Sequence, residues 1–172
     1  MNRATTDGPR PRLAALLAAL SLVACASYDP SRLSVGQSAD EVTRLMGAPT
    51  AIYALPGGAQ RIEYARGPFG RQTYMIDIDA SGHVGGWSQV LSEANFNALP
   101  NGITRDELLR RLGTPGERHR IGWQERDLWA WRYPTNDCLW FTASLDRQQR
   151  VVDSGYGIDP RCDAGDRGGD RQ

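Results

Sequence analysis

The sequence predicts an α+β fold of two tandem ααβββ repeats, with short helices packed on one face of antiparallel three-strand meanders. Three observations predict it: a fourteen-residue motif occurs twice, three stretches with the composition of strands follow each copy, and turn residues separate these stretches. The 172 residues are 40% hydrophobic and 23% charged, which is typical of a globular protein with one domain or two small ones.

The repeated motif reads GQSADEVTRLMGAP at residues 36–49 and GITRDELLRRLGTP at residues 102–115. Six of the fourteen positions are identical, at an offset of 66 residues. Further along the offset is 67, because Tyr64 aligns with Trp131, so one residue is inserted between the two aligned blocks. A period of this length that occurs twice indicates a duplicated module rather than a solenoid.

Each copy of the motif predicts a short helix with both ends specified. Ser38 and Thr104 are each followed three residues later by glutamate, which is the pattern of a capping box at a helix start. The Gly-x-Pro that closes each copy ends the helix. A further capped helix is predicted at residues 92–99, with a weaker counterpart near residues 29–33. Helices this short are stable only when they pack on other structure.

Three strands are predicted after each motif helix, since β-branched and aromatic residues alternate with polar ones between short turns. Trp129, Trp131 and Tyr133 share one face of one predicted strand, and this favours a position in the core over an exposed binding surface. The predicted strands are residues 60–66, 71–78 and 84–90 in the first repeat and 127–133, 138–145 and 151–156 in the second.

The N-terminus has the pattern of a secretory signal. Arginines precede an apolar stretch at residues 13–23, which is too short to span a bilayer. The stretch ends in LVAC at Cys25, which resembles the lipobox of bacterial lipoproteins. That resemblance implies cleavage before Cys25 and attachment of acyl chains such as palmitate to it. Ala26 in the next position implies sorting to the outer membrane, with the chain facing the periplasm. The alternative is an ordinary signal peptide cut near Ala24.

The lipobox, the capped helix that ends in Gly-x-Pro, the aromatic first strand and the turn before the last strand together resemble the SmpA/OmlA (BamE-like) family of outer-membrane lipoproteins. The resemblance covers residues 33–158 in two copies, and the tandem arrangement resembles the β-lactamase inhibitory protein fold. It implies a non-enzymatic, lipid-anchored module that binds periplasmic or outer-membrane proteins, such as the β-barrel assembly machinery. The alternatives are an inhibitor of a periplasmic or secreted hydrolase and a structural envelope lipoprotein.

This organisation divides the chain into five segments. The expected segments are a signal peptide at 1–24, a lipidated cysteine and tether at 25–32, a first repeat at 33–91, a second repeat at 92–160 and a disordered tail at 161–172. The chain has 20 basic and 20 acidic residues, and this balance argues against a broad nucleic-acid footprint.

No motif for catalysis, a metal or a cofactor is recognisable. The two histidines, His83 and His119, have no Cys, His or carboxylate partners at the spacing of a metal site. Asp77 and Asp79 stand two apart on one predicted strand face and could be paired carboxylates, but a solvated strand end is the favoured interpretation. We therefore expect no enzymatic activity, no metal and no cofactor.

Cys138 and Cys162 remain once Cys25 is assigned to the lipid. In an antiparallel hairpin the start of one strand lies beside the end of the next, and the periplasm is oxidising. We therefore predict a disulfide between Cys138 and Cys162, with two unrelated thiols as the alternative.

The candidate binding site lies in residues 118–126, which are predicted to form a polar loop. Trp123 stands there among Arg118, Arg120 and Arg126. An exposed aromatic residue among arginines is a candidate contact for a partner protein. The same residues could instead contact anionic lipid headgroups.

Overall fold

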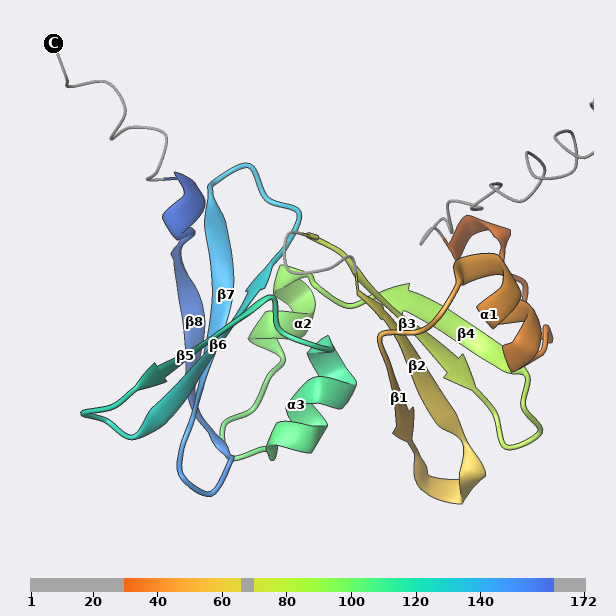
Figure 1. The fold of residues 1–172 in the computed structure, drawn as a ribbon, viewed down its shortest axis with the longest axis horizontal. Coiled ribbons are helices and arrows are strands. Elements are labelled where there is room, and N and C mark those ends of the chain that lie inside the picture. Colours follow the sequence, from red (N-terminus) through yellow and green to blue (C-terminus); the bar gives the residue numbers. More distant parts are fainter. Residues whose placement is uncertain (1–29, 66–69, 163–172) are drawn as a thin grey trace, which may run out of the picture.

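The computed structural model describes residues 30–65 and 70–162. It has mixed α and β structure, with two four-stranded antiparallel sheets and a few short helices (Figure 1). We call residues 30–91 the first unit and residues 92–162 the second unit. Cys25, the expected signal peptide and the first part of the expected tether lie outside the described residues. In the described part of the chain, no helix has the length and apolar character needed to cross a membrane.

The first unit contains one α-helix and one sheet. The weak helix expected near residues 29–33 is a single 3₁₀ turn, and the sheet has the order β1-β2-β3-β4. Its elements are η1 (Pro30–Arg32), α1 (Ala39–Met46), β1 (Ala51–Ala54), η2 (Pro56–Gly58), β2 (Gln60–Ala65), β3 (Thr73–Ile78) and β4 (Val84–Gln89).

The second unit contains both predicted helices and a sheet of the order β5-β6-β7-β8. Its elements are α2 (Glu93–Asn97), α3 (Arg105–Leu112), β5 (Glu117–Ile121), β6 (Arg126–Arg132), β7 (Leu139–Leu145) and β8 (Val151–Ile158). Arg161 and Cys162, at the start of the expected tail, belong to the described residues, whereas residues 163–172 do not.

The expectation of three strands in each repeat was wrong, because each sheet has a fourth strand at its edge. β1 has only four residues, so its alternation is too short to recognise. β5 reads ERHRI, and its polar residues on both faces give no hydrophobic period. These two strands precede the predicted meander in each unit and pair with its first strand.

The two units repeat the same hydrogen bonds at aligned positions. The Tyr64 hydroxyl donates to the carbonyl of Gly47 (3.2 Å), and the indole Nε1–H of Trp131 donates to the carbonyl of Gly113 (3.1 Å). Both glycines follow the motif helix with positive φ, which glycine adopts without strain. Further equivalent backbone bonds join Gly36 to Val84 and Ala39 to Gly82 in the first unit, and Gly102 to Val151 and Arg105 to Gln149 in the second.

The inserted residue lies in the hairpin between β5 and β6. In the first unit Ala54 pairs with Gln60, and in the second the aligned pair is Arg120 with Asp127. Five residues separate the first pair and six separate the second. The two units therefore differ in length at the turn that carries Trp123.

The helices and sheets together form two hydrophobic cores. α1 packs on one face of the first sheet, and α2 and α3 pack on one face of the second (Figure 1). Trp129, Trp131 and Tyr133 are 5% exposed or less, which confirms their predicted place in a core. The first core contains Val42, Met46, Ile62, Tyr64, Ile76, Ile78 and Val84, and the second contains Phe96, Leu108, Leu112, Phe141, Ala143, Leu145 and Val151.

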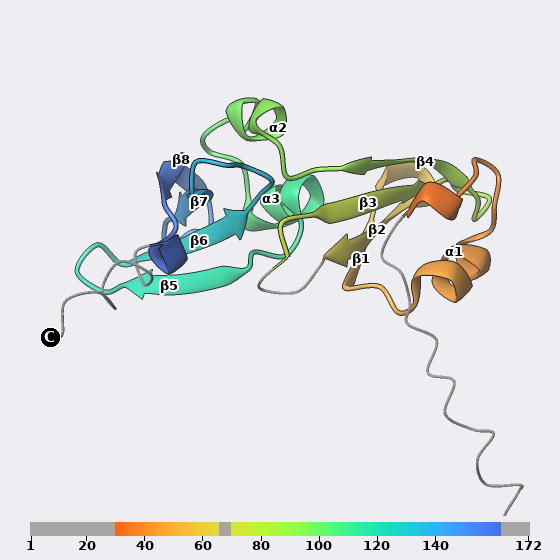
Figure 2. The same ribbon diagram turned by 90° about the horizontal axis from the view of Figure 1, so that it is seen from above.

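The first sheet is covered on both faces, which corrects the expectation that helices lie on one face only. α3 lies between the two sheets in both views (Figures 1 and 2). Met75 of β3 belongs to the same core as Leu108 and Leu112 of α3. The second unit therefore supplies the cover for the face of the first sheet that α1 leaves open.

A buried carboxylate joins the two units. Glu63 of β2 is completely buried and accepts hydrogen bonds from the backbone N–H (2.8 Å) and the hydroxyl (3.2 Å) of Thr114, just after α3. The Tyr53 hydroxyl also donates to it (2.5 Å). Burial and the bond to Glu63 raise the pKa of Tyr53 well above its usual value. Nearby, Arg61 donates to the carbonyl of Arg110 (3.1 Å).

Candidate functional site

Trp123 lies at the tip of a β-hairpin. The predicted polar loop at residues 118–126 is instead formed by β5, β6 and a turn at residues 122–125. The Trp123 side chain is 84% exposed, which is the largest exposure among the large hydrophobic residues of the described chain. Such an exposed indole is a candidate contact for a partner, because burying it in an interface is favourable.

Arg118 and Arg120 both lie on β5 and on the same face of that strand. The guanidinium carbon of Arg118 lies 4.6 Å from the centroid of the Trp129 ring. Arg120 forms an ion pair with Asp127 on the neighbouring strand (3.3 Å). Because Trp129 faces the core under α3, these two arginines flank the α3 side of the hairpin.

Arg126 is separate from the other two predicted arginines. It opens β6 and pairs in register with Ile121, one residue out of phase with Arg118 and Arg120. Side chains alternate between the faces of a strand, so Arg126 lies on the opposite face of the hairpin. The structure thus brings together Arg118 and Arg120, with Trp123 at the tip, but does not add Arg126 to that cluster.

A recess lies beside the hairpin, on the side of α3. Its volume is about 370 Å³. Arg105 contributes to it, although the sequence did not single this residue out. Comparison of the two motif copies would have done so, because Ala39 stands at the aligned position. The residues that line the recess include Arg105, Arg118, Arg120, Asp127, Trp129 and Gln149.

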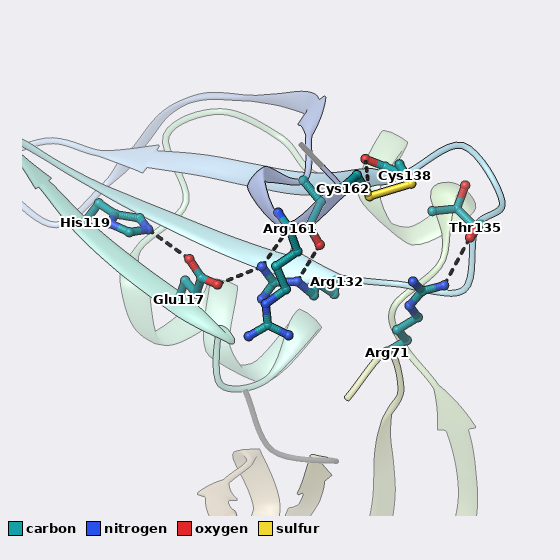
Figure 3. Close-up of polar contacts among 9 residues, drawn as sticks. Arg71, Glu117, His119, Arg132, Thr135, Cys138, Arg161 and Cys162 are labelled. Atoms are coloured by element: carbon teal, nitrogen blue, oxygen red, sulfur yellow. Dashed lines mark hydrogen bonds and ion pairs between the residues drawn. A yellow bond between two sulfur atoms is a disulfide. The ribbon is translucent and has the colours of Figure 1, made fainter. Parts of the chain in front are cut away.

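The other face of the second sheet carries a buried ion cluster (Figure 3). Arg132 of β6 is 6% exposed and donates to both carboxylate oxygens of Asp159 and to Glu117 of β5 (2.7 Å). Burial raises the pKa of Asp159, but the hydrogen bonds from Arg132 and the backbone of Arg161, together with the charges of these two arginines, outweigh it and leave that pKa below its usual value. His119 also pairs with Glu117 (3.1 Å). This cluster fixes the strand edges and the C-terminal turn.

Cys138 and Cys162 form the predicted disulfide, with their Cα atoms 6.1 Å apart (Figure 3). Cys138 directly precedes β7, and Cys162 follows β8. The backbone N–H of Asp159 donates to the carbonyl of Cys138 (2.8 Å), so the same turn is attached by a covalent bond and by a hydrogen bond.

The residues considered for catalysis have structural partners. Asp77 forms an ion pair with Arg61 (2.6 Å). Asp79 accepts from Ser81 and from the backbone of His83, and these bonds lower the pKa of Asp79. Within residues 30–65 and 70–162, no group of three or more His, Cys, Asp or Glu side chains is arranged to hold a metal ion.

No protein-family model and no curated protein matches the chain. One solved structure is described as an osmotically inducible lipoprotein, OsmE, and is 26% identical to this chain. The match covers 34% of this chain and 70% of the OsmE chain, with a TM-score of 0.31. An extracellular protein with an SCP domain from Bacillus anthracis str. Ames is 12% identical over 74% of this chain, with a TM-score of 0.29. A cysteine-rich secretory protein from Staphylococcus aureus subsp. aureus Mu50 is 10% identical over 74% of this chain, with a TM-score of 0.28.

The chain spans 45% of the length of each of the last two structures. All three TM-scores are near 0.3, so the fold described above rests on the sheets and helices of this chain and not on these three structures.

Proposed function

We propose that this chain is a non-enzymatic, lipid-anchored protein of the bacterial envelope that binds a protein partner through the β5–β6 hairpin. Its anchor is the acylated Cys25, its place is the outer membrane, and its two units face the periplasm. The first candidate partner is the β-barrel assembly machinery, which the resemblance to the SmpA/OmlA family implies.

The apolar stretch that ends at Cys25 supports the lipid anchor, and the disulfide supports the compartment. The apolar stretch that ends in LVAC precedes the first described residue, Pro30, by only a few positions. The disulfide between Cys138 and Cys162 fits an oxidising compartment such as the periplasm. More than one acyl chain on Cys25 would make the attachment stable, since a single chain binds a membrane only marginally.

The single observation that carries the binding function is the exposure of Trp123 at the tip of the hairpin. Tryptophan is enriched among the residues that dominate protein interfaces. The aligned turn of the first unit reads LPGGA, contains no aromatic residue and is one residue shorter. The fold therefore forms this turn without a tryptophan, and this supports a role for Trp123 in a contact outside the chain.

The position of the hairpin suits a protein partner. Its tip and η1 lie toward opposite ends of the described molecule in both views (Figures 1 and 2). Cys25 is joined to Pro30 by five residue steps, which span at most about 18 Å. An anchor at that end leaves the hairpin free to project toward proteins in the periplasm.

The test is co-purification from native membranes. The full chain carries a C-terminal tag, the membranes are solubilised in a mild detergent, and the recovered proteins are identified by mass spectrometry. Trp123→Ala is compared with Trp87→Ala, a matched control in the first unit whose indole is 36% exposed. We expect Trp123→Ala to reduce partner recovery by about tenfold or more, as for an interface hot spot, and Trp87→Ala to leave it unchanged.

The identity of the recovered proteins distinguishes the possible functions. Subunits of the β-barrel assembly machinery support the proposed role in assembly. A single stoichiometric hydrolase indicates an inhibitor instead. Equal recovery with Trp123→Ala and with the unchanged chain contradicts binding through the hairpin, provided that both proteins have the same melting temperature.

A further inference from the structure

We propose that the recess between α3 and the β5–β6 hairpin binds an acidic segment of the protein partner. Arg105, Arg118 and Arg120 hold its carboxylate groups. This inference rests on the proposed function, because it names the chemistry of the partner that the hairpin contacts.

The recess has an excess of positive charge. Three arginines and one aspartate line a volume of about 370 Å³ that suits one or two side chains of a bound peptide. Arg105 pairs with the neighbouring Asp106 (3.3 Å), so the excess of positive charge comes from Arg118. Asp127 is already occupied by Arg120 (3.3 Å) and by the side-chain amide of Gln149 (3.1 Å). Arg118 forms no ion pair with any of the residues that the structure describes.

Arg118 is positioned in advance for a carboxylate. Its guanidinium group stacks on the indole of Trp129, at 4.6 Å from the ring centroid, and Trp129 is itself 5% exposed. Stacking uses the flat face of the guanidinium and leaves the N–H groups at its edge available. That planar fork matches the two oxygens of a carboxylate, and a side chain already ordered loses less entropy on binding.

The first unit provides an internal comparison. Ala39, Ile52 and Ala54 stand at the positions of Arg105, Arg118 and Arg120, in the same strand register. The same fold thus forms with apolar residues at all three positions, so folding does not require the arginines. The positive charge is a property of the second unit, on the hairpin where the two units also differ in length.

An acidic peptide fits this site better than a membrane surface. The recess is concave and lies between a helix and a sheet, whereas lipid headgroups form a broad plane. The hairpin also lies toward the end of the molecule opposite η1, which follows the anchor (Figures 1 and 2).

The test is binding of a fluorescently labelled hexaglutamate peptide to the full chain in a nonionic detergent, measured by fluorescence anisotropy. The variant carries Arg105→Gln and Arg118→Gln, and the control carries Arg32→Gln and Arg44→Gln in the first unit, which removes the same charge. We expect the recess variant to bind hexaglutamate at least about tenfold more weakly than the unchanged chain does. The control should bind as the unchanged chain does, and added salt should weaken binding. The melting temperature of each variant checks that it is folded.

Two outcomes overturn the inference. One is equal loss of hexaglutamate binding in the recess variant and in the control, which indicates attraction by overall charge. The other is recess-dependent binding to micelles that carry phosphatidylglycerol without binding to hexaglutamate, which indicates a lipid site. Failure of either kind leaves the Trp123→Ala co-purification result standing, and absence of any co-purified protein refutes the proposed function separately.

Discussion

Glu63 and Thr114, 51 residues apart, form a polar contact between the units: one carboxylate accepts both the backbone N–H (2.8 Å) and the hydroxyl (3.2 Å) of the threonine. Glu63 is fully buried, so water does not replace these bonds if the carboxylate is removed. Gly113, directly before Thr114, allows this approach, because a Cβ there would lie 2.9 Å from the Glu63 carboxyl carbon.

We expect Glu63→Ala to lower the free energy of unfolding by about 3 kcal/mol, because it leaves the partly buried donors of Tyr53 and Thr114 without an acceptor. The strand itself tolerates alanine here, since Ala130 stands at the aligned position of β6. Urea unfolding of Glu63→Ala, Thr114→Val and the double variant measures the coupling. A coupling below about 0.5 kcal/mol would show that the two side chains act independently.

Loss of the disulfide is expected to destabilise the chain. Replacing Cys138 and Cys162 by alanine lowers the free energy of unfolding by about 3 kcal/mol, since a cross-link between residues 24 apart limits the unfolded chain. Reducing agent applied to the unchanged chain gives the same loss in urea unfolding. The double variant is the control, because reducing agent has no bond to break in it, and any further effect there would point to another target.

The ion pair of Asp159 with Arg132 predicts a dependence of stability on pH. The pKa of Asp159 is lowered in the folded chain, so the stabilisation is complete above the ordinary aspartate value of 3.8 and is lost as the pH falls through the lower folded value. We expect the stability difference between the unchanged chain and Asp159→Asn to be largest near neutral pH and to shrink as the pH falls below about 4. Urea unfolding at several pH values measures it, and a constant difference down to the lowest pH would contradict this linkage.

Cys25→Ser is expected to release the protein from membranes, because it removes the sulfur that receives the lipid. Fractionation of cells followed by detection of the C-terminal tag measures the membrane-bound share. Persistent membrane association of Cys25→Ser would refute the lipobox assignment. Cys138→Ser, which breaks the disulfide but leaves the signal unchanged, is the control and should remain in the membrane fraction.

The elements with a one-sided pattern could be predicted from the sequence. Ser38 and Thr104 mark the starts of α1 and α3, and both side chains cap the helix as expected. The predicted capping box is complete only at α1, because the Glu107 side chain pairs with Arg110 and Arg111 instead. Trp129, Trp131 and Tyr133 mark the buried face of β6. These predictions succeed because each depends on neighbours close in sequence, whose spacing fixes which side of an element is apolar.

Features that depend on contacts between the units could not be predicted in the same way. Glu63 alternates with the apolar Ile62 and Tyr64, which is the pattern of a solvent-facing residue, yet α3 and Thr114 cover it. At the candidate site, Trp123 stood out as an aromatic residue among polar ones. Arg105 did not, because its place beside the hairpin depends on how α3 packs against the second sheet.

The place of Glu63 also affects the chain before its two units meet. A chain exported with its N-terminus first presents the strands of the first unit before Thr114 and the helix that precedes it. During that interval the open face of the first sheet carries Met75 next to a hydrated carboxylate, and such a charge opposes association with other exposed strands. We therefore expect Glu63 to be a solubilising group in the partly folded chain, and it is an internal hydrogen-bond acceptor in the finished protein.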